Sequence, residues 1–170
     1  EEPRILYLME TSHSLGEEIS EILKNLFPSQ SGAFRIPLTE ASYAILCPVK
    51  FLADPSQESV HLTARMIVDT VNAEALARVR VSYSKILHNL LDLSSAFRET
   101  SLALKVGKLF YSEQTVFPYN RLGIGRLIYR LPVSLCENFL HEIYGEEIPQ
   151  ALDEEIMATV NKFLQNNLNI

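Results

Sequence analysis

The stretch FRIPLTEASYAILC, residues 34–47, decides the fold. Apolar residues alternate with their neighbours in its first half, from Phe34 to Leu38, and again in its second half, from Tyr43 to Cys47. Alternation with a period of two is typical of a strand with one buried face. The stretch therefore predicts a β-hairpin, although its turn residues, TEAS, lack the Asn-Gly pair that marks the tightest hairpins.

The same kind of pattern predicts elements on both sides of this hairpin. The run RILYLM, residues 4–9, is short and apolar and indicates a buried strand. Ser14 and Glu17 have the spacing of a capping box at the start of a helix, and Pro28 ends that helix. Further strands are expected at 79–83 and 115–118, and further helices at 60–75, 94–110, 122–131, 133–144 and 153–165.

A hairpin flanked by two strand–helix crossovers favours an α+β fold. We expect a ferredoxin-like antiparallel sheet with its helices on one face, followed by a helical extension. Arg78, Arg80 and Ser82 share one side of their strand, opposite Val79 and Val81. If helices cover only the apolar side, these three residues lie on an open face of the sheet.

The 170 residues carry a formal net charge of -6, and the acidic excess lies near the end of the chain. Residues 137–170 hold seven acidic side chains against the single base Lys162, whereas bases outnumber acids in 98–130. A negative surface repels a phosphate backbone, so this chain is not expected to hold nucleic acid on its own. Separate faces for different partners and an ordinary solvated surface are both interpretations of the asymmetry.

Neither a signal peptide nor an apolar run of the roughly 20 residues that span a bilayer occurs in the sequence. Cys47 and Cys136 each lie in an apolar pattern and lack the spacing of metal ligands. Two reduced, buried thiols explain them better than a structural disulfide. We therefore expect a cytoplasmic protein with no membrane partner.

The last nineteen residues, LDEEIMATVNKFLQNNLNI, resemble the start of the DNA-binding domain of PucR/CdaR-type transcription regulators. Asp153 is a good helix N-cap. Phe163-Leu164, Asn166 or Asn167, and Asn169-Ile170 match the first part of that family's LxxTLxxFLxxNxNIxxTA pattern. The family's recognition segment, similar to HRNTLxYRL, does not follow. The chain also begins at Glu1 without a methionine, so we expect a fragment that ends within the first part of a helix-turn-helix domain.

The body of the chain is similar to the GGDEF-like domain that precedes the helix-turn-helix in the same family. The segment SSAFRE, residues 94–99, with Ala103-Leu104 and Gly107, resembles the family's SYxEAxxAL…G helix. Phe117-Pro118-Tyr119 with Leu122-Gly123 resembles its Y(D)xLG step. The resemblance implies a degenerate GGDEF-like domain at 1–119, a helical connector at 120–151, and the first helix of a truncated helix-turn-helix domain at 152–170.

Cyclase chemistry on this fold needs carboxylates that hold two Mg²⁺ ions, and a Gly-Gly hairpin that admits the nucleotide. The first strand contains no Asp, and Glu10 lies only at its end. The hairpin tip has one carboxylate, Glu40, and no glycine, so every residue there carries a β carbon. We therefore expect no enzyme activity, no cofactor and no metal site.

Other groupings of reactive side chains have simpler explanations. The histidines are scattered over four elements, and His88 is expected to be a half-buried, hydrogen-bonded residue. Glu137 and His141 are four residues apart on a predicted helix, but two ligands do not make a metal site. Ser12-His13 lies beside the predicted cap, and Gly123-Ile124-Gly125 is interpreted as a turn at the start of a helix.

Arg121, Arg126 and Arg130 fall within ten residues, and the last two are four apart on one predicted helical face. Guanidinium groups so placed can bind a dicarboxylate or phosphate effector in bidentate fashion. A solvated basic face is the alternative interpretation.

The resemblance implies a non-catalytic regulatory and dimerisation domain that couples an upstream sensor to a downstream DNA-binding helix-turn-helix. A homodimer is implied because paired recognition helices bind paired half-sites. DNA would be a partner only through the missing helix-turn-helix. The alternative is a sensor domain that itself binds a small anionic effector, and a residual nucleotide cyclase is a third hypothesis.

Overall fold

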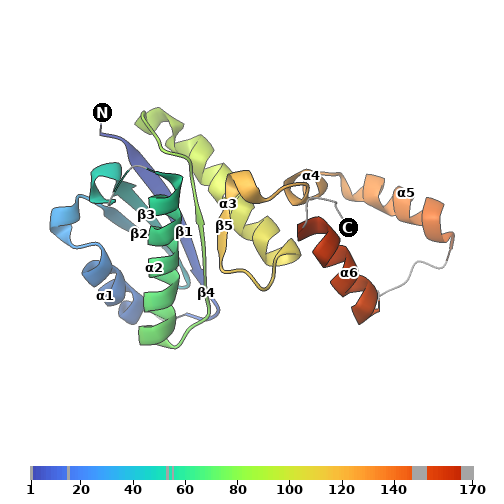
Figure 1. Ribbon diagram of the computed structural model, residues 1–170, viewed down its shortest axis with the longest axis horizontal. Coiled ribbons are helices and arrows are strands. Elements are labelled where there is room, and N and C mark those ends of the chain that lie inside the picture. Colours follow the sequence, from blue (N-terminus) through green and yellow to red (C-terminus); the bar gives the residue numbers. More distant parts are fainter. Residues whose placement is uncertain (1, 15, 53, 55, 147–152, 166–170) are drawn as a thin grey trace.

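The computed structural model describes residues 2–14, 16–52, 54, 56–146 and 153–165, and its elements follow the predicted order (Figure 1). Helices are α1 (Glu17–Leu26), α2 (Gln57–Ala75), α3 (Leu93–Phe110), α4 (Gly125–Ile128), α5 (Val133–Tyr144) and α6 (Glu154–Gln165). Strands are β1 (Arg4–Thr11), β2 (Phe34–Thr39), β3 (Ser42–Pro48), β4 (Val79–Tyr83) and β5 (Val116–Pro118). A short 3₁₀ turn, η4 (Tyr119–Arg121), follows β5.

The five strands form one sheet in the order β2-β3-β1-β4-β5. Neighbouring strands are antiparallel except β4 and β5, which are parallel and are joined by the α3 crossover. The first four strands have the order of a ferredoxin-like sheet. The predicted α+β class is therefore confirmed, and β5 extends the sheet at one edge.

One face of the sheet packs against α1 and α2. Ile5, Tyr7 and Met9 of β1 lie in this core together with Ile19 and Leu23 of α1. The Tyr7 hydroxyl donates a hydrogen bond to the carbonyl oxygen of Val60, at 3.2 Å, and so joins the central strand to α2. On this face the helices lie where the sequence predicts them.

The opposite face of the sheet is covered as well, which corrects the expectation that all helices lie on one face. Leu6 and Leu8 of β1 form a second core with Ala103 and Leu104 of α3. Figure 1 shows α3 on the far side of the sheet from α1 and α2. Since β1 is apolar on both of its sides, it needs two covering layers.

The expectation that β4 has an open face is wrong for the same reason. Ser82 is fully buried beneath α3, and its hydroxyl donates a hydrogen bond to the carbonyl oxygen of Thr100 at 2.8 Å. Arg80 is half-buried, and its Nε is buried without a hydrogen-bond partner among the described atoms. Of the three residues, only Arg78 is exposed.

The predicted hairpin is present, with an irregular register between Pro37 and Thr39. The alternating residues of β3 are buried, but Phe34, Ile36 and Leu38 of the edge strand β2 are exposed. The predicted capping box is wrong: α1 follows Gly16 without a side-chain cap, and the Ser14 hydroxyl instead donates to the Glu40 carboxylate at 3.2 Å.

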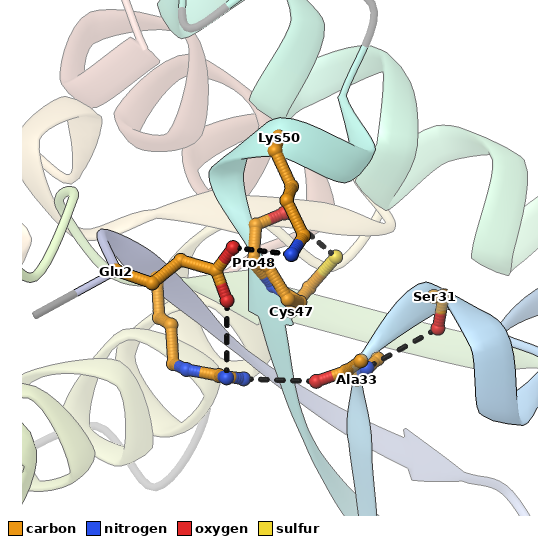
Figure 2. Close-up of polar contacts among 8 residues, drawn as sticks. Glu2, Ser31, Ala33, Cys47, Pro48 and Lys50 are labelled. Carbon is orange, nitrogen blue, oxygen red and sulfur yellow. Dashed lines mark hydrogen bonds and ion pairs between the residues drawn. The ribbon is translucent and has the colours of Figure 1, made fainter.

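Side chains at the start of β1 fasten that strand to its surroundings (Figure 2). The Glu2 carboxylate lies 2.6 Å from Lys50 Nζ and 3.4 Å from Arg4 Nη2, and Arg4 Nη1 donates to the carbonyl oxygen of Gly32 at 2.9 Å. Cys47 of β3 is buried, with its Sγ 3.5 Å from the Pro48 carbonyl oxygen. Burial raises the pKa of the Cys47 thiol to about 12, so this cysteine remains an unreactive thiol at neutral pH.

The chain leaves the sheet after β5. Leu122 and Gly125 are still packed against the body, but no residue of α5 is buried. In α6 the Asp153 carboxylate accepts a hydrogen bond from the Glu155 amide at 3.2 Å, which confirms the predicted N-cap. Asn169 and Ile170, which carry part of the family resemblance, lie outside the described residues. Among the described helices, none has the length and apolarity to cross a membrane.

Candidate functional site

Glu10, near the end of β1, is paired with a lysine of α3. Both of its carboxylate oxygens accept hydrogen bonds from Lys108 Nζ, at 2.7 and 2.8 Å. Ser42 and Arg80 are its partners across the neighbouring strands. Among the described residues, no group of three His, Cys, Asp or Glu side chains is placed to hold a metal ion. The Glu10 carboxylate is therefore paired with the ammonium group of Lys108, and Arg80 is its neighbour on β4.

The sequence did not indicate the Glu10–Lys108 pair. The two residues are 98 positions apart, and Lys108 comes near β1 only because α3 lies on the second face of the sheet. The prediction that put every helix on one face gave Glu10 no such neighbour.

The three arginines that the sequence groups together do not share a site. Arg121 lies beside a hollow of about 270 Å³ that His61, Tyr111 and Gln114 also line. The guanidinium of Arg126 lies over the ring of Tyr119, 5.3 Å from its centre. Arg130 instead lines a separate groove beside α3, together with Arg98 and Lys105. The 3₁₀ turn and the short helix α4 therefore direct the three side chains to three different surroundings.

His61 is one of the titratable groups that line the Arg121 hollow. Its Nδ1 lies 3.2 Å from the hydroxyl of Tyr83, and the two rings meet edge to face. Burial, and then the positive charges of Arg121 and Arg65, lower the pKa of the imidazole below its usual value. Burial raises the pKa of Tyr83, so at neutral pH the pair is uncharged in a region of positive potential.

A groove of about 480 Å³ runs along the outer side of α3, and we call it the α3 groove. One wall is α3 and the other is the segment after α4. Arg98, Lys105 and Arg130 line it, and within the described part of the chain none of them forms an ion pair. Its apolar lining comes from Phe97, Leu102 and Tyr129. The α3 groove thus combines apolar surface with three cationic groups that have no carboxylate partner there.

Helix α5 has apolar residues on one side and is nevertheless exposed along its length. Phe139 and Ile143 are 59% and 57% exposed, and Leu140 is 37% exposed. In α6, Ile156, Met157, Val160 and Phe163 are also exposed. Surfaces of this kind are typical of contacts with another protein segment.

The remaining candidates from the sequence are surface features. His141 Nδ1 lies 3.0 Å from the carbonyl oxygen of Gly145 at the end of α5, and Glu137 is exposed. His88 is exposed, which corrects the expected half-buried position. Ser12 Oγ lies 3.0 Å from His13 Nδ1, and both residues are exposed to solvent.

Comparison of the chain with models of known families, with curated proteins and with solved structures finds no match. The resemblance to PucR/CdaR-type regulators therefore rests on the residues quoted above.

Proposed function

We propose that this chain is a non-catalytic regulatory and dimerisation domain of a PucR/CdaR-like transcription regulator. It would act in the cytoplasm as a homodimer and couple an upstream sensor to a downstream DNA-binding helix-turn-helix. The observation that carries the proposal is the exposed apolar surface of α5 and α6 at the end of a domain that is packed on both faces of its sheet. Helices of this kind need a partner, and a following domain or a second subunit supplies one.

The surroundings of Glu10 support a non-catalytic role. Phosphoryl transfer needs carboxylates that are free to bind Mg²⁺, and Lys108 already neutralises Glu10. The hairpin tip between β2 and β3 carries Glu40, whose carboxylate accepts from Ser14. Lys108 balances the charge of Glu10, and Glu40 by itself supplies less negative charge than a pair of metal ions requires.

DNA selection with the parent protein and with this chain tests the proposal. From a random-sequence library at physiological salt, the parent protein is expected to enrich a defined, two-fold symmetric sequence. Residues 1–170 alone are expected to show no sequence-specific retention in a mobility-shift titration, because the recognition helix is missing and the net charge is -6. Specific retention by 1–170, or a parent protein that enriches no sequence, would overturn the proposal.

Binding of a small anionic effector is the second candidate, and the positive surroundings of His61 favour it. Arg121 and Arg65 both act on this imidazole, and Arg121 also lines the neighbouring hollow. A carboxylate or phosphate in that hollow is expected to raise the melting temperature of the chain in a saturable way. Thermal-shift measurements with organic acids and nucleotides, repeated with Arg121→Gln as the variant that loses the effect, distinguish a sensor from a scaffold.

A further inference from the structure

We propose that α5 of one copy of this chain lies in the α3 groove of a second copy, and that the contact is reciprocal. Two chains would then form a homodimer by exchanging helical arms. This inference deepens the dimerisation part of the proposed function by naming the two surfaces that meet.

Helix α5 is not expected to be stable as an isolated helix. It has 12 residues, and isolated helices of this length are marginal in water. Cys136, Phe139, Leu140 and Ile143 recur at helical spacing and form one apolar stripe, which the rest of the described chain does not bury. The stripe therefore needs an apolar surface from elsewhere.

The charges of α5 and of the α3 groove are complementary. At about 100° per residue, Glu137 and Glu142 fall on opposite sides of the apolar stripe of α5. The α3 groove has the matching arrangement, since Arg98 and Lys105 lie on one wall and Arg130 on the other. A helix with its stripe on the groove floor would place one carboxylate toward each cationic wall, which favours this partner over an uncharged one.

The direction in which α5 leaves the body indicates which copy supplies the helix in the groove. Tyr129 and Arg130 form one wall of the groove, and α5 begins at Val133, just after Pro132. Figure 1 shows α5 extending away from α3 and the sheet, so that it leads out of the groove beside which it starts. The helix that enters the groove therefore comes from a second copy, and two-fold symmetry makes the exchange mutual.

Sedimentation velocity of residues 1–170 with paired charge reversals tests this arrangement. Wild-type protein is expected to be a dimer at micromolar concentration. The groove variant, Arg98→Glu with Lys105→Glu, and the arm variant, Glu137→Lys with Glu142→Lys, are each expected to weaken self-association by about tenfold or more, since like charges would face each other. Circular dichroism checks that both variants remain folded.

An equimolar mixture of the two variants is the decisive sample. In the mixed dimer one contact joins an unchanged arm to an unchanged groove, and the other places the reversed arm against the reversed α3 wall, so the mixture is expected to dimerise more strongly than either variant alone. Lys24→Glu with Arg65→Glu is the matched control, because it reverses the same number of exposed cations on the α1–α2 side and should leave the dimer intact.

Three results would overturn the inference. The first is a wild-type chain that stays monomeric at about 100 µM, a concentration far above the dissociation constant expected of a stable dimer. The second is a mixture that does not regain dimerisation. The third is loss of the dimer with Glu154→Lys and Glu155→Lys in α6 while the arm variant still dimerises, which would assign the groove to α6. The second and third results reject only this pair of surfaces, whereas a monomeric chain also removes dimerisation from the proposed function. DNA selection tests the rest of the proposed function independently.

Discussion

At the scale of single residues, the imidazole of His61 is a group whose protonation the fold opposes. Burial and the nearby charges of Arg121 and Arg65 lower its pKa in the folded state, whereas the unfolded chain keeps a value near 6.5. The unfolded state therefore binds more protons between these two values. The free energy of unfolding contributed by neutral His61 is complete above about pH 6.5 and is lost as the pH falls toward the folded-state pKa.

This linkage predicts a pH-dependent stability that a single substitution reduces. Between about pH 7.5 and 5.5, the free energy of unfolding of the wild type is expected to fall more than that of His61→Gln, which cannot be protonated. Urea denaturation at both pH values measures the two differences, and the carboxylates common to both proteins cancel. Equal pH dependence in the two proteins would contradict the assigned environment of His61.

Gly107 is a second residue with a specific steric role. It is buried in α3, and a β carbon built at this position overlaps the ring of Phe117 in β5. Helix propensity alone would make Gly107→Ala stabilising by about 1 kcal/mol. We expect the opposite, a loss of about 1–3 kcal/mol from overpacking, in denaturant unfolding. Ser101→Ala on the outer side of the same helix is the control, and a stabilised Gly107→Ala protein would show that α3 and β5 are not this close.

At the scale of elements, α3 is the helix whose position matters most for the fold. Leu104 is 7% exposed in the second core, whereas Leu109, five residues later, is 64% exposed. Leu104→Ala is therefore expected to lower the free energy of unfolding by about 2–4 kcal/mol. Leu109→Ala should change it by less than about 0.5 kcal/mol. Thermal or urea unfolding compares the two, and similar losses for both would mean that α3 buries a different side.

The hairpin, the strand order in the chain and the helices could be predicted from hydrophobic periodicity, because each is encoded within a short stretch. The position of α3 could have been inferred from Leu6 and Leu8, which make β1 apolar on both sides. The polar residues Ser82 and Thr100 obscured this, since their hydroxyls donate inside the core to the carbonyl oxygens of Thr100 and Ala96, respectively. A local pattern does not reveal that a hydroxyl will meet a carbonyl oxygen from another element.

The candidate site was less accessible to sequence reasoning for a related reason. The proximity of Arg121 and Arg130 in the sequence suggested one anion site, but η4 and α4 separate their side chains in space. Conversely, Arg98 and Arg130 are distant in sequence and line one groove. Sequence spacing predicts neighbours along a single helix, and it fails across a turn.

At the scale of the whole molecule, the pairing of Glu10 with Lys108 predicts a chain without cyclase activity. Incubation with GTP and Mg²⁺ is expected to yield no cyclic dinucleotide by chromatography, because Lys108 holds Glu10. Lys108→Met frees that carboxylate and should still yield none, since one carboxylate does not hold two metal ions. Product from either protein, above that of a heat-denatured control, would contradict the non-catalytic interpretation.

The two-sided burial of β1 has a consequence for how the chain selects a single native register. In a strand with one polar face, a shift of the register by one residue exposes the apolar side chains to water. The free-energy cost of that exposure disfavours the shifted register. Here a slip would only exchange Ile5, Tyr7 and Met9 for Leu6 and Leu8. Hydropathy thus says little about the alignment of the central strand, and side-chain shape and polar contacts, among them the phenol of Tyr7, distinguish the correct pairing from the shifted one. Tyr7 reaches the Val60 carbonyl from only one side, so sequence drift that preserves apolarity but removes that phenol would reduce the uniqueness of the fold before its compactness.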